Sequence, residues 1–200
     1  MYQLSTDMAN KYAYLKKLLK GNVYLRKTCP YCGNDSEWDD SIYENLVFEV
    51  SGNKIFPDKI IYGGHPGLLI ISQKALMAFE SEGVTGYSPF PVTLCQKGET
   101  LEVQYYVLKV EGKAEFNYKK MGCKPKFYCK ECNYAELDRT NFDRTYIKDG
   151  SWDGSDLFLT DMCTERVLDI IKKYKLTGFM AIDILYAFDS HVDISTYIRL

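Results

Sequence analysis

The sequence predicts an α+β fold with a mixed or antiparallel sheet and few helices. Short apolar segments typical of strands recur along the chain, only a few segments have helical periodicity, and two CxxC pairs lie far apart. The chain has 200 residues, of which 46% are hydrophobic and 26% charged, enough to bury one sizeable core. We therefore expect a single domain over residues 1–200.

The N-terminal part of the chain has local signals for a helix and a hairpin. A helix is predicted over about residues 8–20, ending before Gly21. The segment "LVFEVSGNKIF", residues 46–56, predicts a hairpin that turns at Ser51-Gly52-Asn53. Further strands are predicted in "KIIYGG" (59–64), "GLLIIS" (67–72) and "LEVQYYVLKVEG" (101–112).

Two segments resemble each other when one is shifted by 92 positions, namely residues 68–92 and 158–184. Ser72 then falls on Thr164, and the Thr85-Gly86 pair falls on Thr177-Gly178. Each segment predicts a short strand, a helix of about ten residues whose first turn the Ser or Thr caps, a Thr-Gly turn and a second strand. The second helix has one apolar face, formed by Val167, Ile170, Ile171 and Tyr174.

Because a CxxC pair precedes each segment, we interpret the chain as two related halves, over about residues 24–95 and 120–190. The alternative is that strand–helix–strand units are common and that the two match by chance.

The CxxC pairs are Cys29 and Cys32 in "KTCPYCGND", and Cys129 and Cys132 in "FYCKECNYA". A CxxC turn places two thiolates on one side of a tight loop, and two such turns supply the four soft ligands that tetrahedral zinc prefers. Although 96 residues separate Cys32 from Cys129, the entropy of closing a loop grows only logarithmically with its length. We therefore predict one structural zinc ion per chain that joins the two halves.

Two alternatives remain for these cysteines, a redox dithiol and thiols without metal. A redox CxxC opens a helix after a strand, whereas Gly33-Asn34-Asp35-Ser36 is typical of a turn. Cys123 is a possible competing ligand but is interpreted as a small apolar or loop residue, and Cys95 and Cys163 as core cysteines.

The absence of a recognisable catalytic constellation, and a four-thiolate zinc site without an open coordination position, argue against an enzyme. Net charge is −2, and the two histidines, His65 and His191, belong to no recognisable catalytic constellation. Lysines gather in two stretches without acid, residues 8–34 and 116–130, which lie beside the CxxC pairs and include tyrosines. A nucleic-acid-binding zinc module is therefore the alternative function. No signal peptide or apolar span is evident, so we expect a cytoplasmic protein without membrane contact.

The two CxxC motifs, together with "GLLIISQKALMAFESEGVTGY" and "WDGSDLFLTDMCTERVLDIIKKYKLTGF", resemble the double-CxxCG family of bacterial immunity proteins of polymorphic toxin systems. The resemblance spans roughly residues 24–184, and it departs at Asn133, which stands where the second motif has glycine. It implies a non-catalytic protein that binds and neutralises a cognate toxin in the cytoplasm. Only the four cysteines of the paired motif carry over as site residues.

Overall fold

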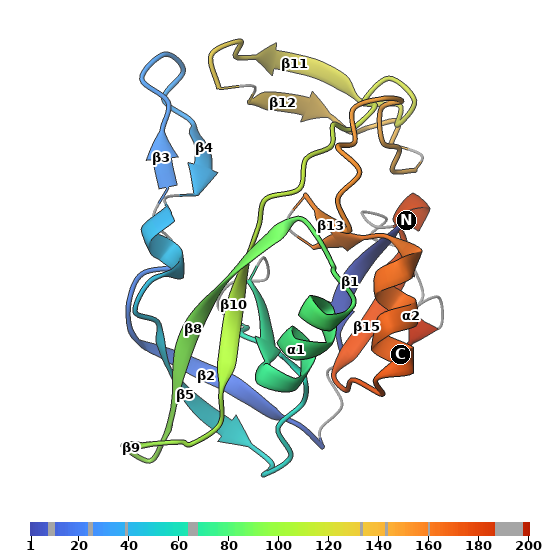
Figure 1. The fold of residues 1–200 in the computed structure, drawn as a ribbon. Coiled ribbons are helices and arrows are strands. Elements are labelled where there is room, and N and C mark those ends of the chain that lie inside the picture. Colours follow the sequence, from blue (N-terminus) through green and yellow to red (C-terminus); the bar gives the residue numbers. More distant parts are fainter. Residues whose placement is uncertain are drawn as a thin grey trace.

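The structure, a computed structural model, describes residues 1–7, 11–23, 26–38, 40–63, 68–132, 134–142, 144–159, 161–186 and 198–200. Sheets dominate it and two α-helices are present, which confirms the predicted α+β class (Figure 1). In these ranges no helix is long and apolar enough to cross a membrane.

The helices are α1 (Gln73–Ser81) and α2 (Glu165–Lys173), with short 3-10 helices η1 (Asp40–Tyr43) and η2 (Ile184–Tyr186). The strands are β1 (Tyr2–Thr6), β2 (Ala13–Lys20), β3 (Arg26–Thr28), β4 (Asp35–Trp38), β5 (Val47–Gly52), β6 (Lys59–Ile60), β7 (Leu69–Ser72), β8 (Tyr87–Gln96), β9 (Glu99–Thr100), β10 (Tyr105–Val110), β11 (Lys124–Tyr128), β12 (Ala135–Asp138), β13 (Leu157–Phe158), β14 (Met162–Cys163), β15 (Phe179–Asp183) and β16 (Ile198–Arg199).

These strands form four sheets. The largest has the order β2-β5-β8-β10-β7-β6, with β9 paired to β8, and the next has the order β13-β14-β1-β15-β16. The hairpins β3–β4 and β11–β12 are separate two-stranded sheets that project from the same end of the molecule (Figure 1). Within the described residues the strand pairs are antiparallel, apart from the parallel pair β5–β8.

The helix predicted over residues 8–20 is wrong for its larger part, because residues 13–20 form strand β2. Ala13 and Leu15 are buried while Tyr14 and Lys16 are exposed, which is the two-residue period of a strand. Pairing with β5 satisfies the backbone and outweighs the local helix preference of the lysine-rich sequence. Residues 8–10 lie outside the described part of the chain.

The hairpin predicted over residues 46–56 is also wrong. β5 ends at Gly52, whose φ is +89°, but the chain does not return alongside β5. Both edges of β5 are occupied, one by β2 and the other by β8, and Ile55 forms a bridge to Tyr12 instead. A local turn signal therefore yields to pairing with strands distant in the sequence.

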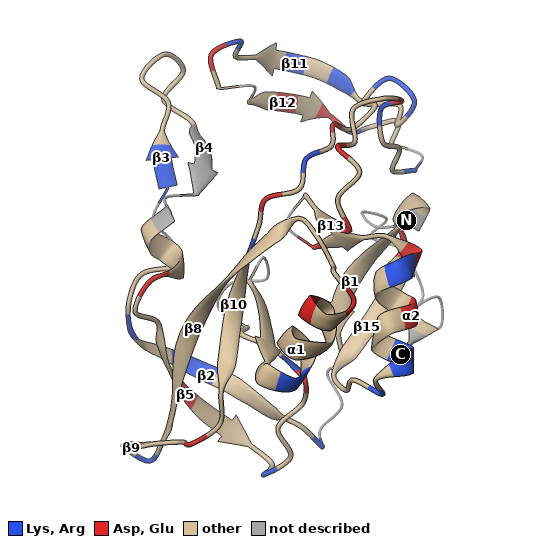
Figure 2. Cartoon of the chain, in the orientation of Figure 1, with Lys and Arg blue, Asp and Glu red and all other residues tan. Residues whose placement is uncertain are grey.

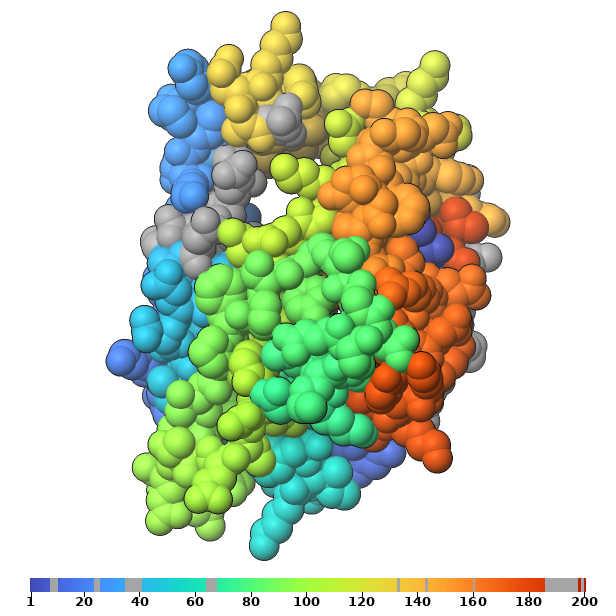
Figure 3. Space-filling view, viewed as in Figure 1, coloured from blue at the N-terminus to red at the C-terminus, as the bar shows by residue number. Residues whose placement is uncertain are grey.

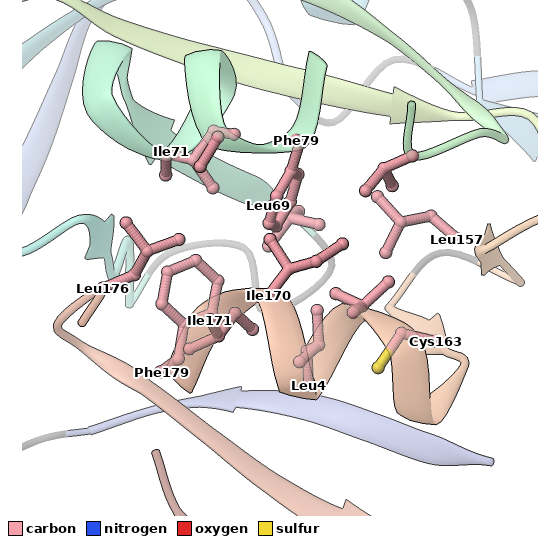
Figure 4. Packing of buried hydrophobic residues seen from close by; sticks show 14 of the residues in the cluster. Leu4, Leu69, Ile71, Phe79, Leu157, Cys163, Ile170, Ile171, Leu176 and Phe179 are labelled. Atoms are coloured by element: carbon pink, nitrogen blue, oxygen red, sulfur yellow. The ribbon is translucent and has the colours of Figure 1, made fainter. Parts of the chain in front are cut away.

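Both strand–helix–strand segments form as predicted, and their helices pack against each other in one core. Figure 4 shows Leu69 and Phe79 of the first segment facing Ile170 and Phe179 of the second. The rings of Phe79 and Phe179 have centroids 6.5 Å apart. A second core cluster, which includes Phe48, lies on the large sheet.

The helix caps follow the prediction at one helix only. The Ser72 hydroxyl accepts the N–H of Ala75 at 3.2 Å, as expected of an N-cap. Thr164 makes no side-chain cap bond, because its hydroxyl donates to Asp156 and its backbone carbonyl accepts the N–H of Val167.

The Thr-Gly turn of each segment is held by an aspartate that precedes the other segment. The Asp58 carboxylate accepts the N–H of Thr177 at 2.8 Å and its hydroxyl at 3.1 Å. It also accepts the Ser72 hydroxyl at 2.7 Å and forms an ion pair with Lys74 at 3.4 Å.

Asp156 makes the corresponding set of bonds in the opposite direction. Its carboxylate accepts the N–H and hydroxyl of Thr85 at 3.1 and 3.3 Å, the Thr164 hydroxyl at 3.0 Å and Arg166 at 2.6 Å. The glycine after each threonine is required as well, because a Cβ on Gly86 would collide with the carbonyl oxygen of Leu157.

The two sheets also share strand order and register. The order β6-β7-β10-β8 in one matches β13-β14-β1-β15 in the other. Tyr106 of β10 lies opposite Ile71 and Pro91, and Tyr2 of β1 lies opposite Cys163 and Asp183. The two partners of Tyr2 therefore lie 92 positions after the two partners of Tyr106, which is the shift that relates the two segments. β1, from the start of the chain, thus completes the sheet of the second segment, and β10 completes that of the first.

Candidate metal centre

Each CxxC pair lies in the turn of a two-stranded hairpin. The N–H of Cys29 donates to the carbonyl of Asn34 at 2.9 Å, and that of Cys129 donates to Tyr134 at 2.8 Å. Gly33 follows the first pair with a φ of +72°, the left-handed conformation that glycine adopts without strain. Asn133, at the corresponding place, lies outside the described residues.

The structure brings all four predicted cysteines together. The Sγ atoms of Cys29 and Cys129 are 4.0 Å apart, those of Cys32 and Cys132 are 3.7 Å apart, and all four lie within 4.8 Å of one another. Tetrahedral coordination with metal–sulfur bonds of about 2.3 Å places the sulfurs about 3.8 Å apart. The cluster therefore has the spacing that a single metal ion requires, and in the described ranges it is the only such group of ligands.

The electrostatics of the cluster favour a cation at its centre. Backbone N–H groups of Cys32 and Tyr31 lower the pKa of Cys29 to about 7. Desolvation raises the pKa of Cys132 to about 12, so burial disfavours the thiolate of this residue in the absence of a cation. A bound divalent ion stabilises thiolates directly, and the four cysteines could hold one in that form.

The hairpins have few apolar contacts to hold them otherwise. All residues of β3 and β11 are exposed, and none of the three core clusters includes a residue of either hairpin. Cys29 and Cys129 are buried, and Cys32 and Cys132 are half-buried. The four thiols thus connect two hairpins whose strands β3 and β11 are exposed.

The remaining cysteines lie outside the cluster. Cys123 is buried and its thiol donates to the carbonyl of Met121, so it does not compete as a ligand. Cys163 is fully buried in the core as predicted. Cys95 is only half-buried, with its sulfur 3.8 Å from the Thr100 hydroxyl, because it lies near the end of β8 and not at its centre. His65 and His191 lie outside the described residues.

Sequence reasoning missed the two aspartates that bind the Thr-Gly turns, Asp58 and Asp156. A signal existed, because "DKI" at residues 58–60 and "DLF" at 156–158 both precede a strand–helix–strand segment. The spacing from Asp58 to Ser72 is six residues longer than that from Asp156 to Thr164, which hides the correspondence in an alignment at one fixed shift.

Comparison with known proteins adds no assignment. A scan against models of known protein families finds no match to this chain, and a search of curated proteins finds no significant match.

Proposed function

We propose that Cys29, Cys32, Cys129 and Cys132 bind one structural zinc ion per chain. Four thiolates are a soft ligand set, for which zinc is the usual divalent ion in proteins. Such a site has no open coordination position, so the metal would connect the hairpins and would not activate a substrate. The support for this assignment is the spacing of the four sulfurs.

On this basis we infer that the chain is a non-catalytic immunity protein, which binds and neutralises a cognate toxin in the cytoplasm. The observation that supports it best is the closed four-thiol cluster, because it accounts for the paired CxxC motifs without catalysis. The resemblance of these motifs and of both strand–helix–strand segments to the double-CxxCG immunity family supplies the partner. The aromatic side chains exposed on the hairpins, such as Tyr31 at 76% exposure, suit a protein-binding surface.

We also propose that the two halves are related copies that have exchanged their first strands. The equal strand orders, the equal registers and the reciprocal bonds of Asp58 and Asp156 support this relation. Each copy would run from its exchanged strand, β1 or β10, and would include one CxxC hairpin. The boundaries then begin earlier than residues 24 and 120.

The test of the immunity function is co-expression with the toxin domain encoded in the neighbouring reading frame. That domain should kill the host when expressed alone and be harmless when this protein is present. Protection should fail against an unrelated toxin, which controls for general effects on growth. Absence of protection, together with absence of binding at micromolar concentration, would exclude this function.

A further inference from the structure

A groove of about 1010 Å³ lies between β11 and the segments that lead to and from its hairpin. Its floor and walls include Phe116, Tyr118, Tyr128 and Leu159, so most of its surface is apolar. The space-filling view shows the molecule hollowed between the hairpins and the two large sheets (Figure 3). The groove is therefore a concave surface beside the four-cysteine cluster, since Tyr128 directly precedes Cys129.

Two lysines at this groove form no ion pair with any residue that the structure describes. Lys119 and Lys124 are exposed, and in the described part of the chain no carboxylate lies within ion-pair distance of either amine. Lys148, which also lines the groove, is neutralised by Glu115 at 2.6 Å. The groove thus presents two lysines that form no close ion pair with a described residue, next to aromatic rings, although Asp138 lies opposite Lys124 across the hairpin. This is an arrangement for binding a negatively charged partner.

The aromatic side chains at the groove are large and accessible. Tyr128 is 52% exposed and Tyr118 is 36% exposed, and the ring of Phe116 packs against that of Tyr118 with centroids 6.2 Å apart. Aromatic residues with a polar tip are the side chains that most often dominate the binding energy of protein interfaces. Leaving them exposed beside a hollow is unfavourable unless a partner covers them.

Acidic residues lie beside the lysines of the groove, which favours a protein partner over a nucleic acid. Figure 2 shows lysines on β11 and an acidic residue at the C-terminal end of the neighbouring strand β12. Asp138 lies directly opposite Lys124 across the hairpin, and Glu136, also in β12, lies opposite Phe127. A nucleic acid carries a continuous row of phosphates and would approach these carboxylates, whereas a protein can place its acids at the groove alone.

We propose that this groove is the toxin-docking surface and that it receives an acidic segment of the toxin, with Tyr128 as the aromatic anchor. The proposal rests on the immunity function proposed above. Acidic side chains of the partner would pair with Lys119 and Lys124, while its apolar side chains would cover the aromatic floor. The four-cysteine cluster would hold β11, and therefore the groove, in its binding geometry.

The experiment compares charge reversal at the groove with the same change elsewhere. The variant Lys119→Glu/Lys124→Glu is matched by Lys54→Glu/Lys97→Glu. Both control lysines are exposed, one in the loop after β5 and the other between β8 and β9, and these loops lie at the end of the molecule away from the hairpins (Figure 1). Tyr128→Ala is matched by Tyr14→Ala, which removes a tyrosine of similar exposure, 43% against 52%. Binding of the neighbouring toxin domain is measured by calorimetry, and circular dichroism and metal content verify that each variant is folded.

Each groove variant should weaken toxin binding by about tenfold or more, while both control variants bind like the wild type. If the wild type binds the toxin and the groove variants bind equally well, the groove proposal is wrong and the immunity function stands. If the wild type does not bind the toxin, both proposals fail. Binding of a short oligothymidylate is measured with the same variants. If the wild type binds it, and the groove charge reversal abolishes this binding while the control charge reversal does not, the assignment to a toxin is also overturned.

Discussion

Cys29 and Cys129 occupy equivalent places in their hairpins, since each backbone N–H bonds to the carbonyl five residues later. Each thiol is buried against the other hairpin, at 5% and 6% exposure. Without a bound partner, a buried thiol in this place would stabilise the fold little, because the hairpins make few apolar contacts of their own. The value of these residues to the fold is therefore expected to depend on the metal.

Replacing Cys129 by Ser should release the metal and destabilise the protein. Serine oxygen is a poor zinc ligand, so the melting temperature should fall by about 5 °C or more, as each kcal/mol corresponds to about 2–4 °C in a domain of this size. Elemental analysis and thermal denaturation measure the two effects. Cys95→Ser, at a half-buried cysteine outside the cluster, is the control and should retain one zinc per chain. Full metal content in Cys129→Ser would contradict the four-cysteine site.

Lys59 is a charged side chain that is buried in strand β6. Lys59 is only 5% exposed, and within the described ranges its amine has no ion pair closer than 4.0 Å. It pairs with Ile71 as Leu157 pairs with the equivalent Cys163, so one sheet has a lysine where the other has a leucine. Desolvation lowers the pKa of Lys59 from 10.5 to about 8, partly offset by the charge of Asp161.

Replacing Lys59 by Leu should stabilise the protein at neutral pH and change its pH dependence. In the wild type the folded state binds fewer protons than the unfolded state between pH 8 and 10.5, so stability should rise with pH over that range. The variant lacks this increment, and its advantage over the wild type should therefore shrink from pH 7 to pH 10. Denaturant unfolding at both pH values measures this difference. A variant less stable than the wild type at pH 7 would show that the amine makes a required interaction.

At the scale of elements, α1 and α2 connect the two segments through their buried faces. Ile171 is fully buried among residues of both segments, and Tyr174 extends the contact by donating its hydroxyl to Glu82 at 2.7 Å. Glu82 also pairs with Lys173 at 2.6 Å, and these bonds lower the pKa of the Glu82 carboxyl. The helix pair is thus the main packing contact between the segments.

Truncating Ile171 to Ala should reduce the free energy of unfolding by about 2–5 kcal/mol, because the deletion leaves a cavity in a packed core. Lys172→Ala, at the neighbouring exposed position of the same helix, should change it by less than about 0.5 kcal/mol. Chemical denaturation of both variants provides the comparison. Equal stabilities would mean that Ile171 is not part of the core.

The elements that the sequence predicted correctly are those whose signal is local. The periodic face of α2 and the Ser72 cap are properties of a few adjacent residues, and both appear in the structure. β2 was mistaken for a helix because its strand character depends on β5, and the hairpin at Gly52 failed because β8 occupies the other edge of β5. Pairing between distant strands leaves little mark on either strand by itself.

At the scale of the whole molecule, the same distinction applies to the candidate site. The residue types and spacing of the CxxC pairs were sufficient to predict that the four cysteines meet. The exchange of β1 and β10 between the sheets was not predictable. β1 lies at the opposite end of the sequence from its partner β15, and β10 lies outside the segment that contains its partner β7. The docking groove likewise depends on how the β11 hairpin sits against residues 114–119.

The position of the cluster determines how the molecule should respond to loss of metal. The two larger core clusters lie in the large sheets and the helices, and none of the three clusters includes the hairpins that carry the cysteines. The hairpins are joined to these cores by the segments on either side of them, and to each other by the thiols. At room temperature, metal loss should therefore free the hairpins while the sheets and helices stay folded, and it should lower the temperature at which these unfold.

Limited proteolysis after chelation tests this expectation. With chelator and reductant, trypsin should cut sooner at exposed Lys27, Lys126 and Lys130 of the hairpins, while the circular dichroism of the sheets and helices changes little. Acidification should have the same effect, because protons compete with the metal for the thiolates. Added zinc should restore protection in the wild type but not in Cys129→Ser. If chelation instead unfolds the chain in one cooperative step, the metal is part of the stability of the cores and the hairpins are not independent units.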